Sequence, residues 1–177
     1  MKIRLLVALA GMAIGFTDRA LAQQNAAGVD PAIIQQLENT ISAKYNEAVD
    51  NHDVAAVAAL YTEDGVEVTD TGPFHGRKAI EKHWADVFKK GHVSNHIGKA
   101  DQYGAHMIGT DGKEVWWNGE WSVTWQAKTG DPIQLNGYWS AIEVLDTDGV
   151  WKNKMETWNR TPAPAATTSP TTTPSNK

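Results

Sequence analysis

The side chains that could carry out chemistry in this 177-residue sequence are histidines, carboxylates and an unusual number of tryptophans. The sequence contains six His, eight Trp and no Cys, so disulfides, thiolate metal ligands and a Cys nucleophile are excluded. His96 is the histidine we expect to project into the fold as an acid–base group at neutral pH. The alternative for His96 is an exposed position near the end of a strand.

No metal, cofactor or nucleic-acid partner is predicted. His92 and His96 are four residues apart, which suits a metal only on a helix, and Gly91 ends the preceding helix. On a strand the two would share one face about 13 Å apart. The sequence has no HExxH motif, phosphate-binding glycine loop, GxSxG motif or basic aromatic stripe. Its net charge of −5 also argues against nucleic acid.

Seven of the eight tryptophans fall on three strands expected in the C-terminal half: Trp116, Trp117, Trp121, Trp125, Trp139, Trp151 and Trp158. Large flat rings can line a pocket for an apolar or aromatic ligand, or they can fill a core or a dimer interface. We expect Trp117, Trp121 and Trp125 in the core or the pocket wall. Trp116 interrupts the polar alternation and is the expected interface residue.

The elements that must position these side chains begin with helices. Asp30 and Pro31 predict a helix start, followed by one apolar stripe at spacings of three and four: Ile34, Leu37, Ile41, Tyr45 and Ala48. Asp53 can cap a second, short helix. A third helix is predicted after Gly76, with Gly91 ending it.

After Gly91 the hydrophobic period changes from 3.6 to 2. Long strands are predicted over 114–125, 133–145 and 150–160, and shorter ones over 66–70 and 95–108. Helices followed by antiparallel strands predict an α+β fold, three N-terminal helices packed on one curved, mainly antiparallel sheet. Glycines inside the strands are its expected bending points: Gly104, Gly119 and Gly137. The concave side is the expected ligand site.

Both ends of the chain are predicted to lie outside the domain. Lys2 and Arg4 precede an apolar run over 5–16, and Ala-Leu-Ala at 20–22 predicts a cleavable signal peptide over 1–22. A short buried N-terminal helix is the alternative. A lead over 23–29 and a domain over 30–160 follow, and the Pro/Thr-rich 161–177 predicts a disordered tail. These features predict a periplasmic or secreted protein with no membrane span after cleavage.

Three stretches resemble the nuclear transport factor 2-like superfamily, most closely its SnoaL-like and ketosteroid-isomerase-like members. They are AKYNEAVDNHDVAAVAALYTEDGVEV (43–68), FHGRKAIEKHW (74–84) and GYWSAIEVLDTDGVWKNKMETWN (137–159). The resemblance covers 31–160 and implies a conical α+β half-barrel, often dimeric, with a deep pocket. Proteins of this shape include isomerases, cyclases and dehydratases, and also non-catalytic association domains.

Ketosteroid isomerases move a proton with a carboxylate and stabilise the enolate oxygen with a Tyr and a protonated Asp. The resemblance places that tyrosine at Tyr45, for which a core aromatic is the alternative. It places the proton-shuttling acid at Thr69 and the protonated acid at Ala141, where neither side chain can do the work. Steroid-isomerase chemistry in its usual form is therefore not expected. Asp70 remains a candidate base if a bulge turns it inward.

The same matching points Trp139 inward, together with Lys154, Glu156 and Trp158 on the last strand. The alternation of the last strand itself disagrees, because Trp151 has the opposite parity. Facing inward, Glu156 and Lys154 would form a polar pair, in which burial raises the pKa of the carboxyl and the lysine lowers it. The alternative is a solvated outer face.

These observations predict a protein that binds a small, largely apolar or aromatic molecule in a Trp-lined pocket. If it is an enzyme, we expect cofactor-free acid–base chemistry of the isomerase, cyclase or dehydratase type. The candidate catalytic residues are Tyr45, Asp70, His96 and Glu156, and the candidate ligand-binding residues are Trp84, Trp121, Trp139, Lys154 and Trp158. The expected partners are a small-molecule ligand and a second copy of the chain across the sheet. The alternative is a non-catalytic dimerisation or interaction module with a filled interior.

Overall fold

The computed structural model of the protein describes residues 28–101 and 104–162. The expected signal peptide and the tail from residue 163 onward lie outside the described residues, so both stay predictions. Among the helices of the described ranges, none combines the length and the apolar character needed to cross a membrane.

The first helix is a continuous rod made of three segments: α2 (Pro31–Leu37), a π-helical turn η2 (Glu38–Ser42) and α3 (Ala43–Asp50). Asp30 caps it as predicted, its side chain accepting a hydrogen bond from the Ala32 amide at 2.8 Å. The predicted stripe is buried at Leu37, Ile41, Tyr45 and Ala48. The π turn widens the helix where it faces the interior, a common feature at functional sites.

Two further helices complete the N-terminal layer. Asp53 caps α4 (Val54–Ala59) by accepting from the Ala56 amide at 2.9 Å. Helix α5 (Arg77–Lys90) starts after Gly76 and stops before Gly91, as the sequence predicts. It contacts β1, β2 and β3 of the sheet described next, so it bridges both edges of that open sheet.

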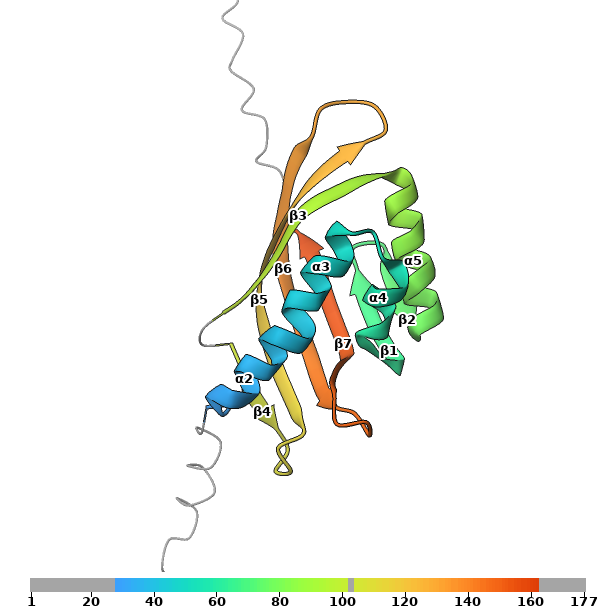
Figure 1. The fold of residues 1–177 in the computed structure, drawn as a ribbon. Coiled ribbons are helices and arrows are strands. Elements are labelled where there is room, and N and C mark those ends of the chain that lie inside the picture. Colours follow the sequence, from blue (N-terminus) through green and yellow to red (C-terminus); the bar gives the residue numbers. More distant parts are fainter. Residues whose placement is uncertain (1–27, 102–103, 163–177) are drawn as a thin grey trace, which may run out of the picture.

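Seven strands form the sheet: β1 (Tyr61–Thr69), β2 (Gly72–His75), β3 (Gly91–Ala100), β4 (His106–Ile108), β5 (Glu114–Ala127), β6 (Ile133–Leu145) and β7 (Trp151–Arg160). The strand order is β2-β1-β7-β6-β5-β3, with β4 on β5, and only β1 and β7 pair in parallel among the described strands. The predicted α+β class is confirmed. Strand β2 was not among the predicted strands. The sheet curves around the long first helix, and α4 and α5 cover its other end (Figure 1).

Two of the three glycines expected to bend the sheet lie where strands approach very closely. A Cβ added at Gly119 would overlap the Lys99 carbonyl oxygen, and one at Gly137 would overlap the Asn159 carbonyl oxygen. Both positions therefore require glycine. Gly104 is different, because it lies between β3 and β4 rather than inside a strand.

A bulge in β3 decides the direction of His96. Ser94 pairs with Thr124 and Ile97 with Ser122, so two residues of β3 stand opposite Val123 alone. The first of them, Asn95, has a φ of 54°. The bulge reverses the alternation after Ser94, which turns His96 inward. The expectation that His92 and His96 share a face is therefore wrong.

A second bulge, in β7, resolves the conflict over the parity of the last strand. Ile142 pairs with Met155 and Glu143 with Asn153, so Lys154 is an extra residue without a partner on β6. Before the bulge, Trp151 and Asn153 face inward, and after it Glu156 and Trp158 do. The alternation of the strand itself thus predicts the inward face correctly before the bulge, and the resemblance predicts it correctly after the bulge.

Candidate functional site

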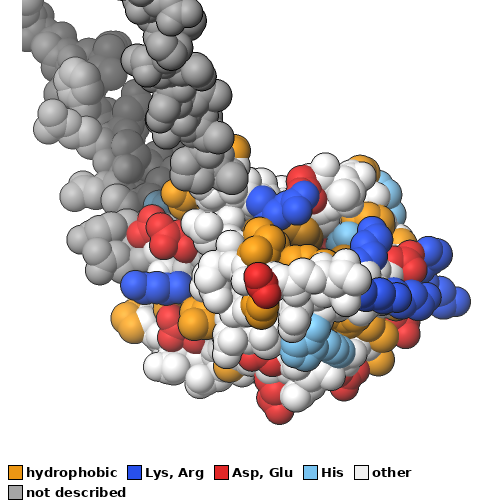
Figure 2. Space-filling view, turned by 90° about the horizontal axis from the view of Figure 1, so that it is seen from above, with side chains coloured by type: hydrophobic (Ala, Val, Ile, Leu, Met, Phe, Trp, Pro, Cys, Tyr) orange, Lys and Arg blue, Asp and Glu red, His pale blue; other side chains and the backbone are white. Residues whose placement is uncertain are grey.

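A cavity of about 700 Å³ lies between the helices and the inner face of the sheet. Its walls come from two separate core clusters: one contributes Ile41, Trp117 and Ala141, the other Tyr45, Trp84 and Val123. The volume is typical of a site for a small molecule. Seen from above, hydrophobic side chains lie near the centre of the face, with Lys and Arg side chains beside them (Figure 2).

Tryptophans form much of the cavity wall. Six of them line it: Trp84, Trp117, Trp121, Trp125, Trp139 and Trp158. All four tryptophans expected to bind ligand are among these six. Trp116 instead lies on the other face of the sheet, where it is 38% exposed and stacks on His106 at 5.4 Å between ring centroids.

Glu156 presents its carboxyl group to the cavity from β7. The Tyr61 hydroxyl donates a hydrogen bond to Glu156 Oε2. Burial raises the pKa of Glu156 to about 7, and the hydrogen bond from Tyr61 opposes that rise. Near neutral pH this carboxyl group is therefore present in both its protonated and its ionised form.

Glu67 lies beneath the cavity, directly beside Glu156 in the parallel pairing of β1 and β7, and is fully buried. The indole N–H groups of Trp84 and Trp158 both donate to Glu67 Oε1 at 3.0 Å. Its other oxygen has no partner among the described residues and lies 4.0 Å from Nε2 of His83, which is also unpaired there. Burial first, and then the Glu156 carboxylate, raise the pKa of Glu67 to about 8.

Glu143 is a third buried carboxyl group and lines the cavity from β6. The Trp117 indole donates to Glu143 Oε1 at 3.1 Å. Asn153, with its amide nitrogen turned toward Glu143, donates to the two carboxyl oxygens at 2.6 and 3.0 Å. Burial is the main cause that raises the pKa of Glu143 to about 8. Glu143 and Glu67 are therefore largely neutral acids at pH 7, and Glu156 is the acid that ionises first.

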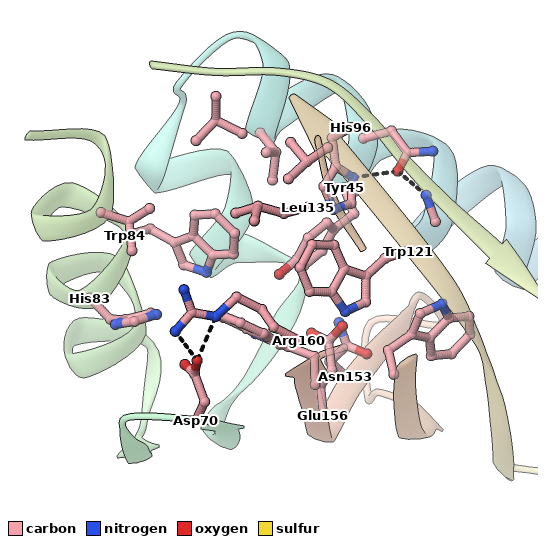
Figure 3. A pocket seen from close by; sticks show the side chains of 18 of the residues that line it. Tyr45, Asp70, His83, Trp84, His96, Trp121, Leu135, Asn153, Glu156 and Arg160 are labelled. Atoms are coloured by element: carbon pink, nitrogen blue, oxygen red, sulfur yellow. Dashed lines mark hydrogen bonds and ion pairs between the residues drawn. The ribbon is translucent and has the colours of Figure 1, made fainter. Parts of the chain in front are cut away.

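Tyr45 and His96 line the opposite wall, with their rings 5.5 Å apart (Figure 3). Burial, followed by the charges of Glu156 and Glu67, raises the pKa of Tyr45 well above its usual value, so its hydroxyl stays protonated. His96 Nδ1 is 2.8 Å from the Asn46 side-chain oxygen, which also accepts from the Gly98 amide. Burial lowers the pKa of His96 to about 4, so this imidazole is neutral at pH 7.

The last two candidates are Asp70 and Lys154, of which only Asp70 lines the cavity. Asp70 lines the cavity just beyond the end of β1, and Arg160 Nε donates to its Oδ2 at 2.7 Å. Lys154, expected on the inner wall beside Glu156, lies outside the cavity lining because it is the bulge residue of β7. It pairs at 2.6 Å with Asp64 instead.

Sequence reasoning missed three important members of the site: Tyr61, Glu67 and Glu143. The resemblance placed the catalytic acids at residues 69 and 141, where this sequence has no acidic side chain. The structure has acidic side chains two residues away, at 67 and 143. Because side chains alternate along a strand, a displacement of two residues keeps the same face. A search for carboxylates at equal parity would have found both.

Chemically, the site places one acid of near-neutral pKa among neutral hydrogen-bond donors in an apolar cavity. Glu156 can accept a proton, while Tyr45 and protonated Glu143 can donate hydrogen bonds. Groups whose pKa values are shifted by burial within a cavity are typical of acid–base sites.

The sequence matches the model of one protein family, and the fold is similar to several solved structures. The family model described as the SnoaL-like domain matches residues 43–153. No curated protein matches the sequence at a significant level.

Several solved structures are similar in fold. A ketosteroid isomerase-like protein from Erwinia carotovora atroseptica has 17% identity and a TM-score of 0.64, over 76% of this chain and 100% of that one. A proposed scytalone dehydratase from Novosphingobium aromaticivorans has 18% identity and a TM-score of 0.61, over 73% and 85%. A proposed calcium/calmodulin-dependent protein kinase II association domain from Xanthomonas campestris has 19% identity and a TM-score of 0.57, over 75% and 89%. At these identities the likeness shows the fold alone.

Proposed function

Because the chain belongs to the SnoaL-like domain family, we propose that its cavity binds a small, largely apolar or aromatic molecule and moves a proton on it without a cofactor. The observation that carries this proposal is the buried acidic floor, where Glu156 and Glu143 face a Trp-lined cavity. Structural cores rarely contain carboxyl groups without a cation beside them, because burial of a charge is costly.

Glu156 is the base in this proposal. Its pKa is the lowest of the three carboxyl groups, and its side chain lines the cavity. Asp70 is already hydrogen-bonded to Arg160, and His96, with a pKa near 4, is a weak base. Glu67 accepts two indole N–H groups beneath the floor and serves to hold Trp84 and Trp158 in place.

The proton transfer is balanced within the site. Glu156 takes a proton from a carbon next to a carbonyl group. The electron pair of the C–H bond forms a carbon–carbon double bond, and the π pair of the carbonyl group moves onto its oxygen. The hydroxyl of Tyr45 and the acid proton of Glu143 are the donors that would stabilise this oxygen. The proton then passes from Glu156 to another carbon, which gives an isomerisation, or to a β-hydroxyl group, which leaves as water and gives a dehydration. In both cases the electron pair on the oxygen re-forms the carbonyl group.

Hydrogen–deuterium exchange tests this proposal before a natural substrate is known. A bicyclic aryl ketone such as α-tetralone is incubated with the protein in deuterium oxide, and loss of the α-proton signal is followed by NMR. We expect exchange above the buffer rate that increases as pH rises through about 7. Glu156→Gln should lose it, and Glu114→Gln, an exposed position at the start of β5, should retain it. Tight binding without exchange at any pH would favour the non-catalytic module.

Export and dimer formation are part of the same proposal. The pattern of residues 1–22 supports export to the periplasm or beyond. Trp116, Ile142 and Met155 pair in a row across β5, β6 and β7, and the apolar side chains of Trp116 and Met155 are exposed there, which supports a homodimer through the sheet. Native mass spectrometry of protein purified from the periplasm tests both, since it reports the mature mass, the subunit number and any bound small molecule.

A further inference from the structure

The proton chemistry proposed above does not use the guanidinium of Arg160 in the cavity wall. Arg160 is the last residue of β7 and lines the cavity. Its Nε and Nη2 both donate to a single oxygen, Oδ2 of Asp70, and its side chain is still 53% exposed. Figure 3 shows this pair on the side of the cavity where α5 carries His83 and Trp84. Since a guanidinium has five N–H donors, several remain for a ligand.

Charge is distributed unevenly along the cavity. The cationic side chains that line it are Lys82, Lys90 and Arg160, and with Asp70 and Asp86 they give this group a formal charge of +3 − 2 = +1. The carboxyl groups of Glu143, which is buried, and Glu156, which is half-buried, belong to the floor instead. An anionic group of a ligand is therefore favoured beside Arg160 and disfavoured at the floor.

The spacing along β7 indicates how a ligand would lie. Glu156, Trp158 and Arg160 alternate on the inner face after the bulge, so about 13 Å of strand separates the first from the last. The Trp158 indole lies between them and offers an apolar surface. A ligand of two or three fused rings would lie over Trp158, with its reacting carbon near Glu156 and its other end near Arg160.

We propose that Arg160 binds an oxyanion, a carboxylate or sulfonate, at one end of the ligand, and that the ligands of this cavity are therefore apolar or aromatic acids. This inference rests on the proposed function, because it concerns the same cavity. A planar guanidinium matches an oxyanion in a way that a lysine does not. Asp70 partly neutralises the guanidinium, so it competes electrostatically with the ligand anion for Arg160.

Two fluorescent naphthalenes that differ by the anion provide the test: anilinonaphthalene sulfonate and the neutral N-phenyl-naphthylamine. We expect the wild-type protein to bind the sulfonate about tenfold more tightly, and the neutral compound to displace it. Arg160→Gln should remove this preference and leave the affinity for the neutral compound within about twofold. Lys113→Gln, which removes an exposed cation that does not line the cavity, should leave both affinities unchanged.

A second variant should increase the affinity for the sulfonate, a result that misfolding cannot produce. Asp70→Asn removes the competing carboxylate, so the affinity for the sulfonate should increase about threefold. The inference is overturned if the neutral compound binds while the sulfonate shows no Arg160-dependent preference, or if the neutral compound does not displace the sulfonate. If neither compound binds to the wild type, the ligand cavity of the proposed function itself is wrong.

Discussion

Each of the three carboxyl groups in and beneath the cavity accepts hydrogen bonds that oppose the effect of burial on its pKa. Glu67 receives two indole N–H groups, and Glu143 receives an indole and an amide. Glu156 receives the hydroxyl of Tyr61 and faces the cavity. A hydrogen bond to an ionised group contributes about 1.5–3 kcal/mol, which offsets part of the cost of burial. The charge of Glu156 also raises the pKa of Glu67 and of Glu143, and this repulsion separates the one acid that ionises near pH 7 from the two that are largely protonated there.

The contact between Tyr61 and Glu156 leads to a prediction about a pKa. Because the phenol stabilises the ionised carboxylate, Tyr61→Phe should raise the pKa of Glu156 above its value of about 7. One lost hydrogen bond corresponds to about one pKa unit. The measurement is an NMR titration of carboxyl groups labelled with carbon-13, in which Glu156→Gln identifies the signal.

Tyr138→Phe is the matched control for that titration, since Tyr138 is 56% exposed on β6. It removes a phenol hydroxyl of the same kind and should leave the Glu156 signal unchanged. If Tyr61→Phe lowered the pKa or left it the same, the hydroxyl would not be the group that sets the acidity of Glu156.

At this scale the sequence could predict some residues and not others. Tyr45 was found because it belongs to an apolar stripe and to a recognisable motif, and Glu156 because it shares parity with Trp158. Tyr61 was not predicted as a site residue, and it is the first residue of β1. Its side chain meets Glu156 only after the parallel pairing of β1 and β7, which joins segments 95 residues apart.

Among the elements, the strands with bulges position the site. An uninterrupted β3 would turn His96 outward, and an uninterrupted β7 could not turn both Asn153 and Glu156 inward. The sequence predicted the three long C-terminal strands well because alternation of apolar residues is a local signal. It could not predict the bulges, since an extra residue is defined by the register of the partner strand and not by its own composition.

Deletion of Lys154 tests the role of the β7 bulge. Without the extra residue, either Trp151 and Asn153 or Glu156 and Trp158 must turn outward. We expect a loss of several kcal/mol in the free energy of unfolding, because a buried tryptophan and its contacts are lost in either case. Urea unfolding followed by Trp fluorescence measures it, and binding of the neutral naphthylamine should be lost as well.

Lys154→Ala is the control for the deletion. It removes the ion pair with Asp64, whose carboxyl is largely exposed, so the free energy of unfolding should change little. Ligand binding should be unaffected, since Lys154 does not line the cavity. A destabilisation by Lys154→Ala as large as that of the deletion would assign the effect to the side chain and contradict the role of the bulge.

In the whole molecule, the open sheet encloses a cavity because α5 contacts both of its edges and the long first helix crosses its concave side (Figure 1). The sequence predicted this architecture from the order of its elements. Whether the interior is hollow or filled depends on how large side chains from distant segments pack, and composition does not contain that information. Six tryptophans stand around the cavity rather than across it, and the acids lie at its floor.

An acidic floor inside a folded protein makes the stability of the whole molecule dependent on pH. Glu67 and Glu143 have pKa values of about 8 in the fold against 4.5 for an ordinary Glu, and Glu156 about 7. The folded state therefore binds more protons than the unfolded state between these values. Stability from these groups is complete below pH 4.5 and is lost as pH rises through about 7 to 8.

The buried imidazoles act in the opposite direction at lower pH. Burial lowers the pKa of His96 from 6.5 to about 4 and also lowers that of His83, so below pH 6.5 the unfolded state binds protons that the folded state does not. Their contribution falls as pH decreases from 6.5. Between pH 6.5 and 8 only the carboxyl groups, and not the histidines, change the pH dependence of stability. In this window the free energy of unfolding should decrease as pH rises.

Urea unfolding at pH 6.5, 7.25 and 8 measures this slope, which we expect at about 1 kcal/mol per pH unit for each carboxyl that is protonated only in the folded state. Glu67→Gln keeps the shape and an acceptor for the two indoles but cannot ionise, so it should make the slope shallower by about that amount. Glu114→Gln, at an exposed position, should leave it unchanged. A stability that increases over this window would mean that the buried acids are ionised in the fold, and the assignment of neutral donors to Glu67 and Glu143 would be wrong.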